Sequence, residues 1–365
     1  MRDRVQQVVT GPQRLLVGAV LALLVVLSAA CEVRGERVNG TGPPAQDLRE
    51  EVSVTLARAN WETGFFQAAI VARLLEDLGY EVTDPAAQTR TPESFYPLLA
   101  RGELDLWVNG WFPLHDAFLE RELVTGQRVD EPIEPVGNLV AGGAVQGYLA
   151  DKATAEALDI TSMEDFARPE VAEAFDQDGD GRADLYGCEE GWGCRLAIDE
   201  HLAQFAWGES VEQTVGDYEA LVAEAGRRID AGEPVLLYTW TPNWTVELLE
   251  PGTDVVWLEA PALPGETAPT SVADLPGCAG DDPCALGWAV NDIRAVGHRV
   301  FLDDNPPVRR LLDVVEIPGS DVAAQNAQML GTDEYTDAQI DEDAAAWIAD
   351  NRDVVDQWLE HARDG

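Results

Sequence analysis

The sequence predicts an α/β fold divided between two lobes, and three observations carry this prediction. A chain of 365 residues with 46% hydrophobic content is longer than one average domain requires. Apolar residues recur at strand spacing in some segments and at helix spacing in others. These strand and helix segments follow one another in turn, which is the pattern of an α/β fold.

The first thirty residues differ from the rest of the chain and form the pattern of an export signal. Arg2, Arg4 and Arg14 precede the apolar run LLVGAVLALLVVLSAA, which ends just before Cys31. Because this run is shorter than the roughly 20 residues that a bilayer span prefers, a cleaved signal over residues 1–30 is favoured over a permanent helix. Cys31 is then the candidate lipidated first residue of a bacterial lipoprotein, with anchoring by an uncleaved helix as the alternative. Either form predicts a protein on the outer face of the cytoplasmic membrane or in the periplasm.

A tether rich in glycine, proline and charged residues is expected over residues 31–50. After it, strands and helices can be assigned in chain order. Strands are expected at residues 52–59, 104–111, 144–151, 234–240, 254–259 and 292–300. Helices are expected at residues 61–80, 91–102, 195–208, 217–232, 305–316, 322–330 and 338–363. Asn60 is the expected cap of the first helix, Gly79 its stop, and Thr91 with Pro92 the start of the second.

The charge of the chain excludes one class of partner. It carries 67 acidic and 24 basic side chains, a formal net charge of -43. A surface this negative repels the phosphate backbone, so nucleic acid is not an expected partner.

Apart from Cys31, the cysteines form two close pairs in the sequence, and four thiols allow three pairings. Joining sequence neighbours, Cys188 with Cys194 and Cys278 with Cys284, needs no assumption about the fold, and disulfides persist in exported proteins. A metal site is the competing interpretation, but neither pair has the spacing usual for zinc ligands. Bridges over such short loops add little global stability, so we expect each one to fix the shape of a loop.

An acidic stretch offers a candidate calcium loop. Four aspartates fall at the first, third, fifth and ninth positions of an EF-hand-like loop: Asp176, Asp178, Asp180 and Asp184. Gly181 occupies the sixth position, and the backbone carbonyl of Arg182 would be the seventh ligand. The twelfth position is Gly187 in place of a bidentate glutamate. Structural calcium is therefore expected as an optional occupant, and a solvated turn without metal is the alternative.

Three short motifs place a tryptophan at the end of a strand or beside a helix start. NGWFPLHD, GCEEGWGC and YTWTPNW contain Trp111, Trp192 and Trp240. A single tryptophan in such a place usually packs in the core. Three of them, where open α/β sheets bind ligands, favour a ligand site. Aromatic faces attract a quaternary ammonium, which has no N–H to donate.

These motifs belong to five longer segments, which follow in the order WVNGWFPLHD, GAVQGYLADKATA, FDQDGDGRADLYGCEEGWGC, PVLLYTWTPNW and DVVWLEAP. In this order and spacing, the chain from about Val52 to its C-terminus resembles the glycine betaine and proline betaine substrate-binding proteins of bacterial ABC importers. The resemblance implies a two-lobe, type II-like periplasmic-binding-protein fold with a hinge and a ligand cleft between the lobes. Residues 51–142 and 264–365 would form the first lobe, and residues 143–263 the second.

The resemblance also implies the binding residues. Trp111, Trp192 and Trp240 would form an aromatic box around the trimethylammonium group of a betaine. His115 and the backbone amides of Gly193 and Cys194 would bind its carboxylate, with Trp111 and His115 in the first lobe.

Other roles stay open for some of these side chains. His115 could instead cap the helix that begins near Pro113. Trp61, Trp107 and Trp244 are assigned to packing, and of these three Trp61 is the one expected to line the cleft.

The expected function is capture of glycine betaine or proline betaine outside the cytoplasm and delivery to the permease and ATPase of an ABC importer, for osmoprotection. A binding protein for choline or carnitine is the alternative within the same class. A secreted hydrolase is the alternative from another class, but the chain has no Gly-x-Ser-x-Gly elbow, Walker loop or histidine metal motif. We therefore expect no enzyme activity and no required cofactor.

Overall fold

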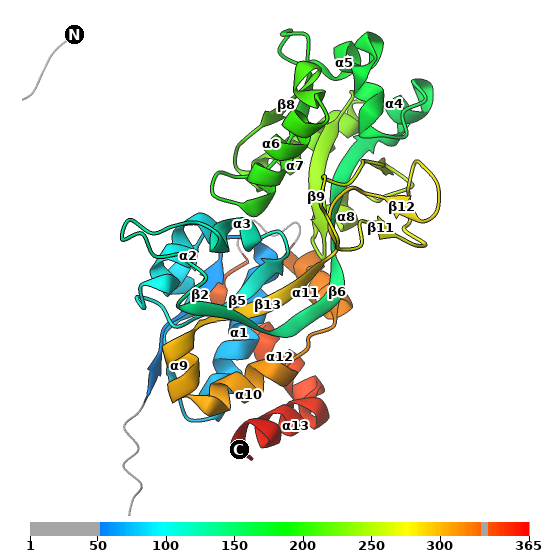
Figure 1. Ribbon diagram of the computed structural model, residues 1–365. Helices are drawn as coiled ribbons and strands as arrows, with labels where there is room; N and C mark the ends of the chain where they lie inside the picture. Colours follow the sequence, from blue (N-terminus) through cyan, green and yellow to red (C-terminus); the bar gives the residue numbers. More distant parts are fainter. Residues whose placement is uncertain (1–51, 330–334, 365) are drawn as a thin grey trace, which may run out of the picture. The chain divides into compact units, whose positions relative to one another are not determined.

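The long strand β6 (Ile133–Asp151) joins two groups of strands in the computed structural model of the protein, which describes residues 52–329 and 335–364 (Figure 1). Its first part, Ile133 to Ala144, pairs with β13 (Asn291–His298), and its last part pairs with β9 (Leu236–Thr241) and β10 (Val255–Leu258). The predicted signal over residues 1–30, the tether and the lipidation site Cys31 lie outside the described residues.

The first group of strands runs in the order β4-β2-β5-β13-β6. β5 (Leu106–Phe112) pairs antiparallel with β13 and parallel with β2 (Leu56–Ala59), which pairs with β4 (Thr89–Arg90). Since β13 comes late in the chain, this lobe is built from two separate stretches of sequence.

The second group runs in the order β10-β6-β9-β7-β8. β7 (Ala183–Tyr186) is parallel to both β8 (Val211–Thr214) and β9. The partner of β6 changes between Ala144 and Val145. The predicted α/β fold with two lobes is thus confirmed. The exact lobe boundaries at 142/143 and 263/264 stay predictions. Beyond the second boundary, the backbones of Gly277 and Ala279 still hydrogen-bond with Trp257 of β10, in the second group of strands.

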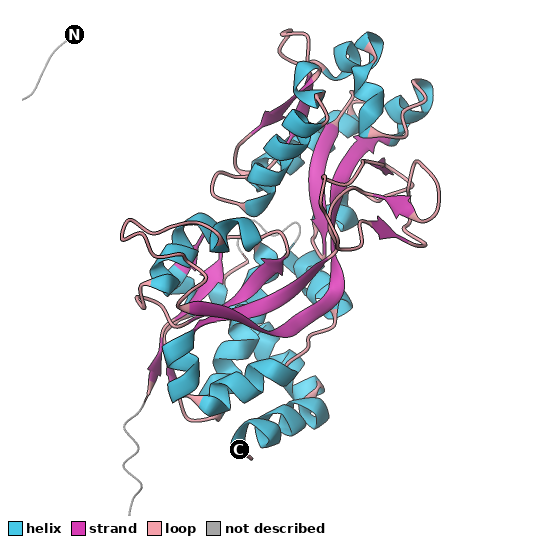
Figure 2. Ribbon diagram, viewed as in Figure 1, coloured by secondary structure: helices cyan, strands magenta, loops and turns pink. Residues whose placement is uncertain are grey.

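Helices flank the strands of both groups (Figure 2). In the first lobe, α1 (Glu62–Asp77) packs against β2 and β5 and against two helices from the end of the chain, α11 (Gly319–Met329) and α12 (Asp337–Asp350). The remaining helices of this lobe are α2 (Pro92–Ala100), α3 (Asp116–Leu119), α9 (Arg299–Asp304), α10 (Pro306–Val314) and α13 (Arg352–Arg363).

The second lobe has its own set of helices beside its strands. They are α4 (Lys152–Ala157), α5 (Pro169–Phe175), α6 (Gly193–Gln204), α7 (Tyr218–Asp230) and α8 (Thr245–Leu248). Three 3₁₀ turns and four short strands complete the described elements: η1 (Pro85–Gln88), η2 (Met163–Ala167), η3 (Trp207–Glu209), β1 (Ser53–Val54), β3 (Glu81–Val82), β11 (Ser271–Val272) and β12 (Cys284–Ala285). None of the helices within the described ranges is long and apolar enough to cross a membrane.

Two predictions about helix ends are wrong. Trp61, with extended backbone, is the N-cap residue of α1, and no side chain caps this helix, so Asn60 is free for other contacts. The single helix expected over residues 338–363 breaks at Asn351, because α12 packs against α1 while α13 packs against α10. The Asn351 amide donates to the Trp347 carbonyl at this break.

Both predicted disulfides are present. Cys188 is bonded to Cys194, and Cys278 to Cys284, each with a sequence separation of 6. The first bridge closes the loop that enters α6, and the second closes a loop beside β10. Each therefore fixes a loop, as the short spacing predicts.

Candidate functional site

A pocket lies between the two groups of strands and encloses about 300 Å³ between atoms, part of it open to solvent. It is lined by Trp61, Trp111, Leu114, His115, Gln146, Trp192, Gly193, Cys194, Tyr238 and Trp240. The structure thus brings together all six residues that the sequence singled out for a ligand. Trp107 and Trp244 are buried and do not line the pocket.

The three predicted tryptophans converge on this pocket from both lobes. Trp111 lies on β5, Trp192 directly precedes α6, and Trp240 lies on β9. The ring centroid of Trp240 lies 5.6 Å from that of Trp192 and 6.5 Å from that of Trp111, with interplanar angles of 79° and 88°. These rings pack edge to face, and together the three indoles form an aromatic cluster at the pocket.

The edge of each indole is held by a side-chain oxygen. The indole N–H of Trp111 donates to Asn109 on the same strand, at 2.9 Å. The other two N–H groups donate to the first lobe, Trp192 to Asn60 at 2.9 Å and Trp240 to Thr63 at 3.4 Å.

His115 also lines the pocket, as a neutral imidazole. Its Nδ1 atom accepts a hydrogen bond from the backbone N–H of Trp111 at 3.2 Å and lies 2.9 Å from the Tyr96 hydroxyl. Since a backbone N–H can only donate, Nδ1 carries no proton and the neutral ring is protonated at Nε2. Burial lowers the pKa of His115 to about 3, so the ring is uncharged at neutral pH. His115 precedes α3 but makes no side-chain cap, so the capping alternative is wrong.

The amides of Gly193 and Cys194 are the first two of α6, where backbone N–H groups have no partner within the helix. The positive end of the helix dipole favours an anion here. A Cβ atom on Gly193 would lie 3.0 Å from Leu114 and 3.1 Å from the His115 ring, so glycine lets this amide approach the first lobe closely. The bridge from Cys188 to Cys194 holds the loop that presents the amides and Trp192 together.

Sequence reasoning missed Leu114, Gln146 and Tyr238. Gln146 lies opposite Trp240 in the ladder between β6 and β9, and its amide oxygen accepts from the Tyr238 hydroxyl at 2.6 Å. Its amide nitrogen is buried without a hydrogen-bond partner among the described residues. Tyr238 precedes Trp240 by two residues, so strand periodicity alone would have placed it on the same face.

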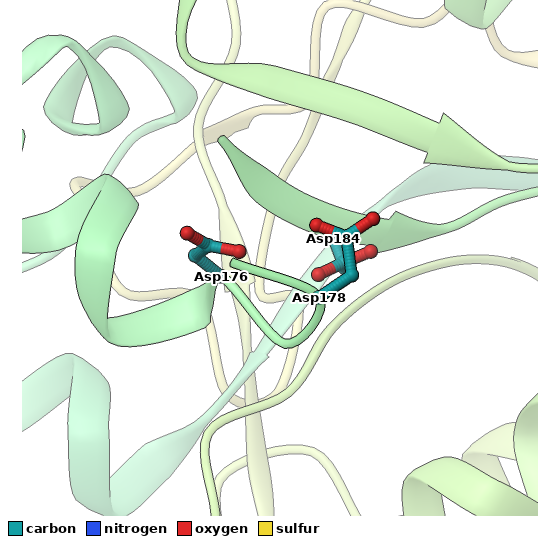
Figure 3. A group of neighbouring side chains, drawn as sticks. All are labelled: Asp176, Asp178 and Asp184. Atoms are coloured by element: carbon teal, nitrogen blue, oxygen red, sulfur yellow. The ribbon is translucent and has the colours of Figure 1, made fainter. Parts of the chain in front are cut away.

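The acidic loop leads from α5 into β7 (Figure 3). Carboxylate oxygens of Asp176, Asp178 and Asp184 lie within 4.8 Å of one another, a ligand set of the kind that calcium prefers. The Asp180 carboxylate instead pairs with the Arg182 side chain, which lowers the pKa of Asp180. Calcium at this loop stays a prediction.

Two lobes that share one long strand and line one pocket together define the chain as a substrate-binding protein of the periplasmic type. Solved structures share this fold. The glycine betaine/L-proline-binding protein ProX from Borrelia burgdorferi superposes with a TM-score of 0.62 at 16% identity, covering 84% of this chain and 96% of the other. A choline binding protein of an ABC transporter, in complex with choline, superposes with a TM-score of 0.62 at 20% identity, covering 86% of this chain and 94% of the other.

Sequence comparison identifies the family. The glycine betaine/proline betaine-binding periplasmic protein of Salmonella typhimurium is 35% identical over 299 residues, which cover 81% of this chain and 86% of that protein. The glycine betaine-binding periplasmic protein OusX of Dickeya dadantii is 34% identical over 347 residues, covering 94% of this chain and 97% of the relative. The sequence model for the substrate binding domain of ABC-type glycine betaine transport systems matches residues 52–350, and this chain belongs to that family. It is a substrate-binding protein and not an enzyme, so the hydrolase alternative is wrong.

Proposed function

We propose that the protein is exported, captures glycine betaine or proline betaine in an aromatic cage, and delivers it to the permease and ATPase of an ABC importer for osmoprotection. One observation carries the proposal. Trp111, Trp192 and Trp240 line a single pocket together with the His115 ring and with Gly193 and Cys194 at the start of α6. Relatives that match most of the chain are named as periplasmic proteins that bind these betaines.

The chemistry of a betaine requires both sides of this pocket. The quaternary ammonium group has no N–H and is attracted to the negative faces of aromatic rings, each contributing up to about 2 kcal/mol when desolvated. Three faces supply roughly 6 kcal/mol, whereas micromolar affinity needs about 8 kcal/mol. Donors to the carboxylate must therefore supply the rest and offset the cost of ordering.

The donors suit a carboxylate. His115 presents Nε2–H as a neutral donor, and Gly193 and Cys194 present backbone N–H groups at the positive end of α6. Hydrogen bonds to a charged acceptor are each worth about 1.5–3 kcal/mol, more than neutral ones. Two such bonds bring the gross total to about 9–12 kcal/mol, and the part above about 8 kcal/mol is available to offset the cost of ordering.

Capture is coupled to closure because the ligand site is divided between the lobes. A betaine that touches Trp111 and His115 on one side and Trp192 and Trp240 on the other binds the closed form more tightly than the open form. The closed form then docks on the permease. We propose that lipidated Cys31 holds the protein at the membrane and that the tether over residues 31–50 lets it reach the transporter.

Choline or carnitine is the second candidate ligand. Each carries the same trimethylammonium group, and a choline binding protein shares the fold. Choline has no carboxylate, so it would leave the donors of His115 and α6 without a charged acceptor. The geometry therefore favours betaines over choline.

Calorimetry of the purified protein tests this ranking. We expect micromolar or tighter binding of glycine betaine and proline betaine, weaker binding of carnitine and choline, and weakened binding of dimethylglycine, which lacks one methyl group. Tight choline binding without betaine binding would overturn the ranking. Absence of binding to every one of these compounds would reject the proposed function.

A further inference from the structure

We infer that the start of α1, residues 60–63, is a latch between the lobes that orients two of the three cage tryptophans. Asn60 holds Trp192, and Thr63 holds Trp240. Both are positioning residues, since the pocket is not lined by either of them. The inference rests on the proposed function and deepens it.

Asn60 uses both ends of its amide on the second lobe. Its Oδ1 atom accepts from the indole N–H of Trp192 at 2.9 Å, and its Nδ2 atom donates to Glu189 at 3.0 Å. The other carboxylate oxygen of Glu189 accepts from the backbone N–H of Tyr218 at 3.3 Å. Asn60 thus connects the first lobe to the loop before α6 and to the start of α7.

Thr63 makes the equivalent contact with β9 and is completely buried. Its hydroxyl donates to the carbonyl of Pro242 at 2.9 Å and accepts from the indole N–H of Trp240 at 3.4 Å. Asn326 of α11 donates to the same hydroxyl oxygen at 3.4 Å. The hydroxyl is therefore held within the first lobe while it binds two groups of the second.

The orientation of each indole matters because the ring is not uniform. Its face is negative and attracts a cation, whereas its N–H edge is positive and repels one. A buried N–H without an acceptor also costs free energy. A hydrogen-bond acceptor for the indole N–H, placed away from the ligand, therefore directs the face of the ring toward the pocket.

The third tryptophan shows the contrast. Trp111 donates to Asn109, two residues earlier on the same strand, so its orientation needs no contact between lobes. Trp192 and Trp240 reach their acceptors only when the lobes meet. The latch therefore stabilises the closed form and the completed cage together, and it is absent from the open form.

A latch made only in the closed form slows ligand release without changing association. We expect Asn60→Ala and Thr63→Val each to raise the dissociation rate of glycine betaine about tenfold, because each removes two hydrogen bonds between the lobes. The association rate should change less than twofold. Stopped-flow tryptophan fluorescence measures both rates on the full-length protein.

Two further variants separate positioning from stability. Thr63→Ser keeps the hydroxyl and should restore slow release. Thr83→Val is the matched control and should leave both rates unchanged. Within the described part of the chain, the Thr83 hydroxyl bonds to backbone groups of Leu56 and Val54, both in the first lobe.

The outcomes are distinguishable. Normal betaine binding with unchanged release in both Asn60→Ala and Thr63→Val would overturn the latch alone. Equal release from Thr63→Ser and Thr63→Val would also overturn it, because the hydroxyl would then be irrelevant. Failure of the unchanged protein to bind any betaine would overturn the proposed function and the latch with it.

Discussion

The two sides of the pocket are held in different ways. On the first lobe, the Trp111 indole is held by Asn109. The His115 ring is held by the Tyr96 hydroxyl and the backbone of Trp111, and all these contacts lie within that lobe. On the second lobe, the indole edges of Trp192 and Trp240 are held by acceptors of the opposite lobe. One side is held within its own lobe, and the other is held by contacts between the lobes.

This difference indicates how the binding energy is divided. A side that is already ordered can meet the ligand first at little entropic cost. A side that is ordered by closure contributes mainly to retention. We therefore expect changes to Trp111 and His115 to affect both capture and release, and changes to the contacts that hold Trp192 and Trp240 to affect release above all.

The largest effect is expected at Trp192. Trp192→Ala removes one cage face and the donor to Asn60, so affinity for glycine betaine should fall about a hundredfold, a loss of about 3 kcal/mol. Calorimetry measures this change. Trp347→Leu is the control, since Trp347 stacks on Trp358 away from the pocket and should not alter affinity. Unchanged affinity in Trp192→Ala would remove this residue from the site.

A smaller loss is expected on the first lobe. His115→Phe keeps an aromatic ring but removes the Nε2–H donor, so affinity for glycine betaine should fall about thirtyfold, about 2 kcal/mol. Choline, which has no carboxylate, should be affected far less. If both ligands lost affinity equally, His115 would shape the pocket rather than bind the carboxylate.

The contact between the lobes should also depend on pH through Glu62. Burial, and then the neighbouring Glu219 of α7, raise the pKa of Glu62 to about 8. A carboxyl whose pKa is raised in the closed structure stabilises that structure fully at pH values below its ordinary pKa of 4.5. This stabilising free energy is lost as the pH rises through about 8.

Betaine affinity of the unchanged protein should therefore decline between pH 5 and pH 8, by several-fold. Glu62→Gln cannot ionise and should flatten this decline. A titration series at fixed salt compares the two proteins, and parallel pH curves would show that Glu62 does not couple to closure.

The smallest effect is expected at the acidic loop, which lies away from the ligand pocket. If calcium binds Asp176, Asp178 and Asp184, a chelator should lower the melting temperature by a few degrees and leave betaine affinity almost unchanged. Asp178→Asn should remove the response to calcium. A melting temperature unaffected by both calcium and chelator would favour the solvated turn.

Several features of the fold follow from local sequence signals. The stop of α1 at Gly79 needs only a residue that accepts a φ of +93°, and Thr91 caps α2 through its own hydroxyl. The two disulfides join cysteines six residues apart, so their pairing could be predicted without knowing the fold. The motifs around Trp111, Trp192 and Trp240 identified the pocket because each places its tryptophan at the end of an element.

Other features depend on contacts that no local pattern encodes. The sequence did not predict the first part of β6, because Pro135 and Gly137 are typical of a loop. Pairing with β13 makes this segment a strand. Asn60 resembles a helix cap in the sequence but bonds to Trp192 and Glu189 instead.

The sequence by itself determined most of the helices and strands and how the cysteines pair, because these depend on residues close to one another along the chain. That Trp111, Trp192 and Trp240 meet was expected from the family resemblance, and it depends on the tertiary structure. Only the tertiary structure decided which lobe holds each indole edge, which ring nitrogen of His115 carries the proton and that Gln146 faces Trp240. The physical reason is that a hydrogen-bond partner is chosen by distance in space, and residues such as Thr63 and Trp240 become neighbours only when the lobes come together.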